Sequence, residues 1–149
     1  MKVAIASDHG GLELKNVINE HLKDKGIEVI DCGTYTKESC DYPDYAEKAC
    51  KKVQDGNAEI AILVCGTGLG MSIAANKMKN IRAVVCGEEF SAYHAKSHNN
   101  ANVLCLGARV VGIGLATLIV DTFLNASFEG GRHERRVNKI AQLESSLFE

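Results

Sequence analysis

The chain has 149 residues, of which 46% are hydrophobic and 24% are charged, and its formal net charge is -2. This composition excludes a disordered or low-complexity protein and predicts one domain, spanning residues 1–149, with a substantial core. The absence of a basic tract argues against nucleic acid as the main partner, and no apolar run is long enough to cross a membrane, so we expect a cytoplasmic protein.

Strand and helix signals alternate along the chain. In chain order, the pattern predicts a strand over Val3–Ala6, a helix over Leu12–Leu22, a strand over Ile27–Asp31, a polar loop over Gly33–Tyr42 and a helix over Pro43–Val53. It continues with a strand over Ile60–Cys65, a helix from near Met71, a strand over Ile81–Cys86, a helix over Glu89–Ser97, a strand over Val103–Leu106, and helices over Leu115–Leu124 and Arg132–Leu147. Nearly continuous apolar strands between helices indicate an α/β fold whose parallel sheet is covered on both faces.

A glycine loop follows the apolar run at 60–65. Cys65 ends this run, glycines follow at positions 66, 68 and 70, and a helical pattern begins near Met71. A glycine loop between a strand and a helix can hold an anion on its backbone N–H groups, and a thiol beside it is a candidate nucleophile or general base. The alternatives are a tight turn that only permits close packing and a buried structural cysteine.

Nucleotide and phosphatase motifs fit this loop poorly. A phosphate-binding P-loop requires a lysine after its last glycine, and here Met71 stands there. The dinucleotide fingerprint lacks its third glycine for the same reason, although Glu88 has a plausible offset for a ribose contact. A cysteine phosphatase would need an arginine within the loop. The other cysteines lack zinc-site spacing and are expected to be reduced thiols, most of them in the core.

Three further groups of polar residues are candidates for a site. Asp8 and His9 follow the first strand, where Asp8 can cap a helix or bind sugar hydroxyls. His98 ends a helix and is a candidate acid or base; a metal site with His94, one turn earlier, is discounted. Arg132 and Arg136 share a helix face that suits a phosphate, or that is a solvated face paired with Glu134 and Glu144.

Together the motifs resemble the ribose-5-phosphate isomerase B family, which includes galactose-6-phosphate isomerase subunits and allose-6-phosphate isomerases. The matching segments are Ser7–Gly11, Asp41–Pro43, Cys65–Gly70, Ala74–Lys77, His98–Asn99, Gly107–Gly112, and Gly131–His133 with Arg136. The resemblance implies a three-layer α/β/α, Rossmann-like domain with a five-stranded parallel sheet and an extending C-terminal helix. It also implies aldose–ketose isomerisation of a sugar phosphate without metal or organic cofactor.

The resemblance assigns a role to each matching position. Cys65 is implied as the base that moves a proton between C1 and C2; one branch of the family carries a glutamate at the position of Met71 instead. His98 and Thr67 are implied to assist opening of the sugar ring. Asp8, Tyr42 and Asn99 are implied to bind the sugar oxygens. The N–H groups of Gly66, Gly68, Leu69 and Gly70 would stabilise the enediolate. Phosphate binding falls to His9, Arg109, Arg132 and Arg136.

The last two arginines are implied to reach in from a neighbouring subunit. The minimal active unit is therefore expected to be a homodimer, and a tetramer is left open. We expect interconversion of D-ribose 5-phosphate and D-ribulose 5-phosphate through a cis-enediolate, in the pentose phosphate pathway. The alternatives are a six-carbon substrate, allose 6-phosphate or galactose 6-phosphate, and a non-catalytic module that binds a phosphosugar or a nucleotide.

Overall fold

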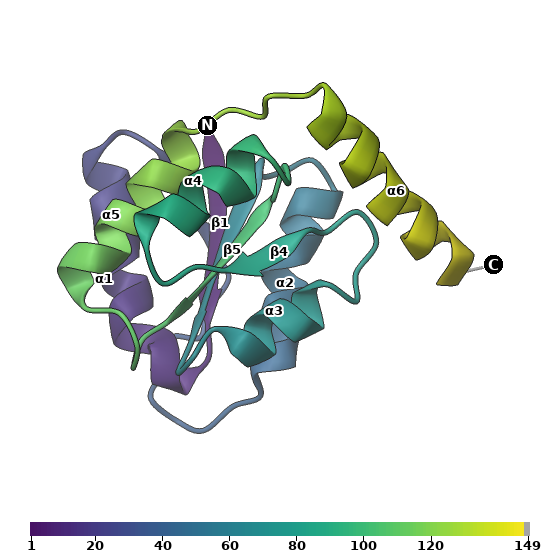
Figure 1. Ribbon diagram of the computed structural model, residues 1–149. Coiled ribbons are helices and arrows are strands. Elements are labelled where there is room, and N and C mark those ends of the chain that lie inside the picture. Colours follow the sequence, from purple (N-terminus) through teal and green to yellow (C-terminus); the bar gives the residue numbers. More distant parts are fainter. Residues whose placement is uncertain (148–149) are drawn as a thin grey trace.

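Five apolar segments pair into one parallel sheet in the computed structural model, which describes residues 1–147 (Figure 1). The strands are β1 (Lys2–Ser7), β2 (Glu28–Asp31), β3 (Ile60–Cys65), β4 (Ala83–Val85) and β5 (Val103–Gly107). Their order across the sheet is β2-β1-β3-β5-β4. Because every pair is parallel, the carboxyl ends of the strands share one edge, which we call the rim.

Helices cover both faces of the sheet, as the alternation of signals predicts (Figure 1). One face packs against α1 (Leu12–Asp24), α4 (Glu89–Ser97) and α5 (Ile113–Asn125) through a core of mostly large aliphatic side chains. The other face packs against α2 (Tyr42–Gln54) and α3 (Leu69–Ala75) through a core rich in alanine and cysteine. A short 3-10 helix, η1 (His9–Gly11), precedes α1.

The last described helix, α6 (Arg132–Leu147), projects beyond this three-layer body (Figure 1). Its only buried residue is His133. One contact with the body joins its Glu144 carboxylate to the N–H of Asn80, with N–O distances of 2.9 and 3.1 Å. Within residues 1–147, no helix has the length and apolar character that a membrane crossing requires.

The predicted fold class is confirmed, and several element bounds agree with the structure. The strand Ile60–Cys65 and the helices Glu89–Ser97 and Arg132–Leu147 have the predicted bounds. The strand expected over Ile81–Cys86 is shorter, because the N–H of Ile81 donates to the carbonyl of Met78 in a turn at 3.2 Å. Helix α3 begins before Met71, since Gly68 is its N-cap, with a φ of 81°.

Glu88 has a structural role that differs from the ribose contact considered above. It is the N-cap of α4, and its carboxylate oxygens accept the N–H of Ser91 at 3.1 and 3.0 Å. A side-chain acceptor at this position satisfies one of the free donors at the start of a helix. Helix capping therefore accounts for a glutamate at position 88 without a ribose contact.

Candidate active site

The order in which strands are added to the sheet changes direction between β1 and β3, since β2 lies on one side of β1 and the later strands lie on the other. Parallel sheets open a crevice at such a point, beyond the carboxyl ends of the strands. The register pairs Ser7 with Val64, so the next residues, Asp8 and Cys65, lie at the same level, where Cys65 is the last residue of β3 and pairs with Gly107 of β5. The N–H of Asp8 also donates to the carbonyl of Val64 at 3.2 Å. The fold thus brings a carboxylate and a thiol, 57 positions apart in the printed sequence, to one point of the rim.

The Cys65 thiol is held in a fixed place at this point. The residue is 5% exposed, and the N–H of Gly68 donates to its Sγ atom over 3.1 Å. The carbonyl of Cys65 accepts the N–H of Ala108 at 2.8 Å, which ties the end of β3 to the loop after β5. A backbone donor interacts more strongly with a thiolate than with a neutral thiol, so this contact suits a cysteine that exchanges a proton.

The loop after Cys65 presents free backbone donors. Within residues 1–147, the N–H groups of Gly66, Thr67 and Gly70 have no hydrogen-bond acceptor. The positive φ of Gly68 turns the chain here, and the Thr67 hydroxyl accepts the N–H of Leu69 at 3.2 Å. The N–H groups of Gly68 and Leu69, which were expected to face the enediolate, therefore already have acceptors within the loop. Unpaired donors beside a proton-accepting group are the arrangement that stabilises a developing oxyanion.

Close backbone packing explains why a second glycine lies opposite this loop. A Cβ on Gly107 would lie 2.7 Å from the carbonyl oxygen of Thr67. The loops after β3 and β5 are therefore in direct backbone contact, which leaves little freedom for the donors around Cys65.

Asp8 and its neighbours pack against the same loop. Asp8 is 8% exposed, and its Oδ1 atom accepts the N–H of Gly11 at 3.1 Å. Asp8 therefore caps η1, which is one of the two roles expected from the sequence, beside binding of sugar hydroxyls. A Cβ on Gly10 would lie 3.4 Å from this Oδ1 and 3.7 Å from the amide nitrogen of Gly66. The carboxylate and the glycine loop therefore flank one small glycine.

Tyr42, the first residue of α2, lies over the start of α3. A Cβ on Gly70 would lie 2.7 Å from two ring carbons of Tyr42. The tyrosine ring therefore occupies the space that any other residue at position 70 would need. This contact brings a phenol from a distant helix to the glycine loop.

His9 and Arg109 line one hollow of about 540 Å³ next to the loop. The side chain of Arg109 extends across Gly66, because a Cβ there would lie 3.6–3.7 Å from three of its atoms. The Nδ1 atom of His9 accepts the N–H of Cys40 at 3.2 Å, which assigns the ring proton to Nε2. Lys37 and Glu13, paired at 2.9 Å, also line the hollow. The hollow therefore presents the Arg109 guanidinium, the Lys37 ammonium and the Nε2–H donor of His9 to an anion.

Three of the other cysteines lie deep in the core. Burial raises the pKa of Cys50 to about 12 and that of Cys86 to about 11. Burial also raises the pKa of Cys105 well above its ordinary value. These three thiols stay protonated at neutral pH and belong to the core, as predicted.

His98 and Asn99 lie away from Cys65 within one chain. Helix α4 starts at the rim after β4 and ends at Ser97, so the residues that follow it approach the opposite edge of the sheet. There the carbonyl of Asn102 accepts the N–H of Ala61 at 3.0 Å, at the beginning of β3. Cys65 is four residues further along this strand, a distance of about 13 Å. The chain's own His98 is thus at the wrong edge of the sheet to meet its own Cys65.

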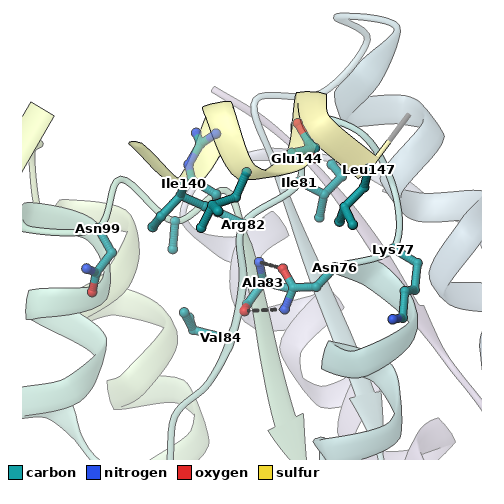
Figure 2. A pocket seen from close by; sticks show the side chains of 12 residues that line it. Asn76, Lys77, Ile81, Arg82, Ala83, Val84, Asn99, Ile140, Glu144 and Leu147 are labelled. Carbon is teal, nitrogen blue, oxygen red and sulfur yellow. Dashed lines mark hydrogen bonds between the residues drawn. The ribbon is translucent and has the colours of Figure 1, made fainter. Parts of the chain in front are cut away.

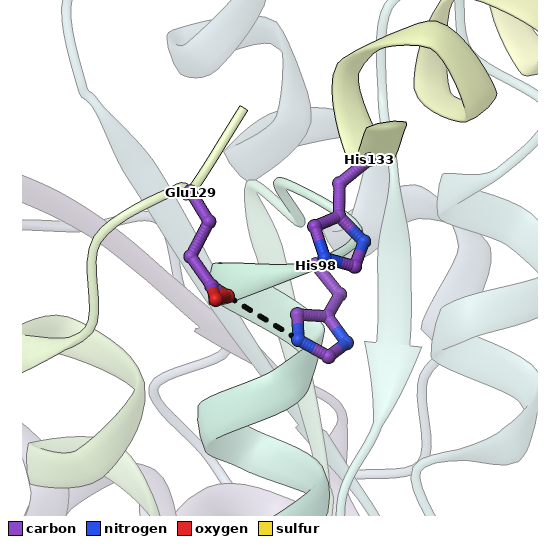
Figure 3. Close-up of side chains that lie close together, drawn as sticks. All are labelled: His98, Glu129 and His133. Atoms are coloured by element: carbon purple, nitrogen blue, oxygen red, sulfur yellow. Dashed lines mark ion pairs between the residues drawn. The ribbon is translucent and has the colours of Figure 1, made fainter. Parts of the chain in front are cut away.

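His98 instead belongs to a cluster with the segment before α6 (Figure 3). Its Nε2 atom is 3.3 Å from a carboxylate oxygen of Glu129, and its ring stacks on that of His133 with centroids 4.0 Å apart and planes at 12°. The N–H of Glu129 donates to the carbonyl of Ser97 at 3.0 Å. His94 contacts the His98 ring edge-on, while its Nδ1 lies 2.8 Å from the carbonyl of Phe90.

Arg132 and Arg136 extend this cluster with unpaired positive charge. Both are exposed, and neither forms an ion pair with an acidic side chain of residues 1–147. The pairing with Glu144 that would make them a solvated face is absent, since that carboxylate accepts the N–H of Asn80. Burial lowers the pKa of His133, and the charges of His98, Arg132 and Arg136 lower it further. We call His98, Asn99, Glu129, Arg132, His133 and Arg136 the α6 patch.

An apolar groove of about 470 Å³ adjoins the α6 patch (Figure 2). Ile140, Leu143 and Leu147 of α6 face Ile81 and Val84 of the body across it. Asn99 lies at the margin of the groove, whereas the rim residues are absent from its lining. The groove is therefore a feature of the α6 side of the molecule.

The predicted site residues thus form two groups. Asp8, His9, Tyr42, Cys65, Gly66, Thr67, Gly68, Leu69, Gly70 and Arg109 meet at the rim, while His98, Asn99, Arg132 and Arg136 meet in the α6 patch. Glu129 and the contact between His98 and His133 were not predicted from the sequence. The buried Lys15, which pairs with Asp31 at 2.7 Å, was not predicted either. No spacing rule could have found these contacts, because each joins segments distant in sequence.

The chain resembles known isomerases over nearly its whole length. The sequence profile of the Ribose/Galactose Isomerase family matches residues 3–140. Ribose-5-phosphate isomerase B of Escherichia coli K12 is 51% identical over 143 residues, which cover 96% of each chain. A structure of Clostridium thermocellum ribose-5-phosphate isomerase B superposes with a TM-score of 0.98 at 52% identity, over 99% of both chains.

A further structure carries a ligand. Ribose-5-phosphate isomerase B from Mycoplasma genitalium, with bound ribulose-5-phosphate, has a TM-score of 0.93 and 46% identity, over 97% of this chain and 96% of that one. Profile, sequence identity and fold all indicate the same family. This chain belongs to the ribose/galactose isomerase family.

Proposed function

We propose that the chain interconverts D-ribose 5-phosphate and D-ribulose 5-phosphate. The observation that carries the proposal is the position of the Cys65 thiol. It lies at the topological switch point between β1 and β3, beside a loop with three free N–H donors. Support comes from the relatives, which are named ribose-5-phosphate isomerase B, and from the Mycoplasma genitalium structure with bound ribulose-5-phosphate. A binding module without chemistry would not require a proton acceptor at this point.

Cys65 is proposed as the base of the isomerisation. Its thiolate takes the proton from C2 of the open-chain aldose, and the electrons of that bond form a cis-enediolate with negative charge on O1. The thiol then returns the proton to C1, while the O2 proton passes to O1, so that O1 becomes a hydroxyl and the new carbonyl forms at C2. Protons move and no electron leaves the substrate, so the proposed step invokes no cofactor.

The loop donors are proposed to hold the enediolate. The N–H groups of Gly66, Thr67 and Gly70 are fixed before the reaction by the packing of the loops after β3 and β5. A preorganised donor of this kind contributes about 3–4 kcal/mol to the stability of a developing oxyanion. Asp8 and Tyr42 flank the loop and are proposed to hold the sugar hydroxyls.

His9 and Arg109 are proposed to bind the phosphate at the far end of the substrate. Both line the hollow beside Gly66, and the Nε2 proton of His9 is free to donate. Remote phosphate binding positions C1 and C2 against the thiol, and this positioning lowers the barrier to proton transfer.

The α6 patch is proposed to complete the site of a second subunit. Arg132 and Arg136 carry positive charge without an acidic partner in residues 1–147, and His98 and Asn99 lie beside them instead of beside Cys65. A two-fold dimer would place this patch on the partner's rim and repeat the contact in both directions. A tetramer built from two such dimers would keep each site unchanged. The apolar groove under α6 supports an interface on this side.

A substrate panel tests the proposed function. The purified protein is assayed with ribose 5-phosphate, allose 6-phosphate and galactose 6-phosphate, and kcat/KM is compared among them. We expect the highest kcat/KM for ribose 5-phosphate. A kcat/KM at least tenfold higher for a six-carbon sugar phosphate would show that this sugar, and not ribose 5-phosphate, is the substrate. Binding of every sugar phosphate without turnover would reject the proposed isomerase activity.

A further inference from the structure

His98 is held by two residues for which neither the motifs nor the resemblance gives a role (Figure 3). The Glu129 carboxylate lies 3.3 Å from Nε2 of His98, and the His133 ring lies flat against the His98 ring at 4.0 Å. The backbone N–H of Glu129 donates to the carbonyl of Ser97, the residue before His98, at 3.0 Å. One short segment therefore fixes His98 through its main chain, its ring edge and its ring face.

The geometry of the three side chains suits support of His98 better than coordination of a metal ion. The ligand atoms of His98, Glu129 and His133 lie within 4.8 Å of one another. A ring nitrogen, however, directs its lone pair within the plane of the ring, and these two planes are stacked and nearly parallel. Two parallel lone pairs do not converge on one ion at the usual 2.0–2.1 Å.

The ion pair with Glu129 favours one location of the His98 proton. An ionised carboxylate 3.3 Å from Nε2 attracts positive charge at that atom, so it favours the imidazole with its proton on Nε2. Nδ1, on the other side of the ring, is then free to accept and return a proton. The stacked His133 ring, which is 9% exposed, limits rotation of the His98 ring about its own bond.

We propose that Glu129 and His133 are positioning residues that prepare His98 for opening of the sugar ring in the partner's site. This inference rests on the proposed isomerase and its shared site. In ring opening, the C1–O4 bond breaks and the C1–O1 double bond forms. Nδ1 of His98 takes the proton of the O1 hydroxyl and delivers a proton to O4, so that protons and electrons balance without a co-reactant.

The same segment also links ring opening to phosphate binding. Arg132 stands between Glu129 and Arg136 in the sequence and is next to His133. A shift of the segment would therefore move the phosphate ligands and His98 together. Removing the Glu129 charge alone should leave the arginines in place and affect His98 selectively.

A double-mutant cycle with Cys65 tests the inference. Glu129→Gln and His133→Ala are made in the wild type and in Cys65→Ser, and kcat/KM for ribose 5-phosphate is measured. We expect each to lower kcat/KM about tenfold in the wild type, the scale at which one charge-assisted contact acts. In Cys65→Ser, where proton transfer at C2 limits the rate, the same changes should cost less than threefold, because ring opening no longer limits turnover.

The isotope effect of ribose 5-phosphate deuterated at C2 gives a second readout. Ring opening and proton transfer share the rate limit in the wild type, so Glu129→Gln should lower this effect towards unity. An isotope effect that stays at the wild-type value would contradict slower ring opening. His133→Phe, which keeps a flat ring, should retain the wild-type rate. The matched control is Glu134→Gln, an exposed carboxylate in the first turn of α6, which should behave as the wild type.

The results that overturn the inference are distinct from failure of the proposed function. Equal losses in both backgrounds would indicate general damage, and no loss in the wild type would remove Glu129 and His133 from any role. Inactivation by a chelator, reversed by Zn²⁺ and absent in Glu129→Gln, would assign the three residues to a metal centre instead. A wild-type protein that does not convert ribose 5-phosphate would reject the isomerase itself.

Discussion

The rim around Cys65 and the α6 patch carry similar kinds of side chain, but they are built differently. The rim is fixed from within the chain, since Cys65, Asp8 and the glycine loop are held by buried backbone contacts and by glycines that admit no side chain. The α6 patch stands at the start of a projecting helix, with exposed arginines that lack acidic partners in residues 1–147. The rim is thus prepared for precise chemistry, and the patch is prepared for contact with another molecule.

This difference explains why neither group makes a complete site by itself. In the proposed reaction the rim supplies the proton acceptor, the oxyanion loop and two phosphate ligands, but the imidazole assigned to ring opening, His98, is not on it. The α6 patch holds His98 and two guanidinium groups but has no thiol. A shared site is the arrangement in which each region supplies what the other lacks.

The largest expected effect tests the chemical role of the rim. Replacing the thiol in Cys65→Ala removes the proton acceptor, and kcat should fall about 10³-fold, within the range for loss of a general base. Substrate binding, measured by calorimetry, should change little because the phosphate ligands remain. The thermal midpoint should also stay close to that of the wild type.

The matched control for this variant is Cys86→Ala. Cys86 also follows a strand at the rim, but its side chain is in the core between the sheet and α4, α5. It should cost stability and leave kcat unchanged. Wild-type turnover by Cys65→Ala would remove the thiol from the reaction.

A smaller effect is expected in the α6 patch. Arg136→Ala removes one charge-assisted contact with phosphate, worth about 1.5–3 kcal/mol, so KM should rise about 10- to 100-fold. Because Arg136 is exposed and makes no ion pair in residues 1–147, the free energy of unfolding should not change. Arg135→Ala, on a neighbouring face of α6, is the control and should keep the wild-type KM.

The smallest effect tests the close packing of the rim. In Gly70→Ala the new Cβ would lie 2.7 Å from the Tyr42 ring, so the ring must move from its place over the loop. We expect kcat/KM to fall about tenfold, the loss of one hydrogen-bonded contact to the substrate. Alanine favours a helix over glycine by about 0.5–1 kcal/mol, so stability need not fall.

Gly114→Ala provides the comparison for this variant. Gly114 is also in the first turn of a helix, and a Cβ there would meet nothing within 4 Å. It should leave kcat/KM unchanged. An equal loss of kcat/KM in both variants would show that the effect comes from replacing a helix glycine. It would contradict a role for the contact between Tyr42 and the glycine loop.

The rim could be predicted from the sequence because its signals are local. Cys65 ends an apolar strand, the glycines follow it directly, and parallel strands place Asp8 on the same edge. The order β2-β1-β3-β5-β4 was not predicted, because the insertion of β5 between β3 and β4 depends on how α4 packs and leaves no periodic trace. The short β4 is a consequence of a turn at Ile81 that interrupts an apolar run without any glycine or proline.

The α6 patch could be predicted only in part. The spacing of Arg132 and Arg136 indicated a shared helix face, and the resemblance implied a neighbouring subunit for these two residues. The location of His98 with them depends on tertiary contacts with Glu129 and His133, 31 and 35 positions further along. Such contacts are set by where the last two helices meet, which no local pattern encodes.

Restoration of activity in mixed oligomers tests the shared site most directly. Cys65→Ala and Arg136→Ala are co-expressed in equal amounts, and the mixture and each variant alone are assayed with ribose 5-phosphate well below the wild-type KM, where Arg136→Ala alone has little activity. If rim and patch come from different subunits, half of the sites in mixed dimers are intact, so activity should recover to about one quarter of the wild type by random pairing. A mixture of Cys65→Ala with Asp8→Asn, both on the rim, should recover nothing. Activity of the first mixture no higher than the mean of its two components would contradict the shared site.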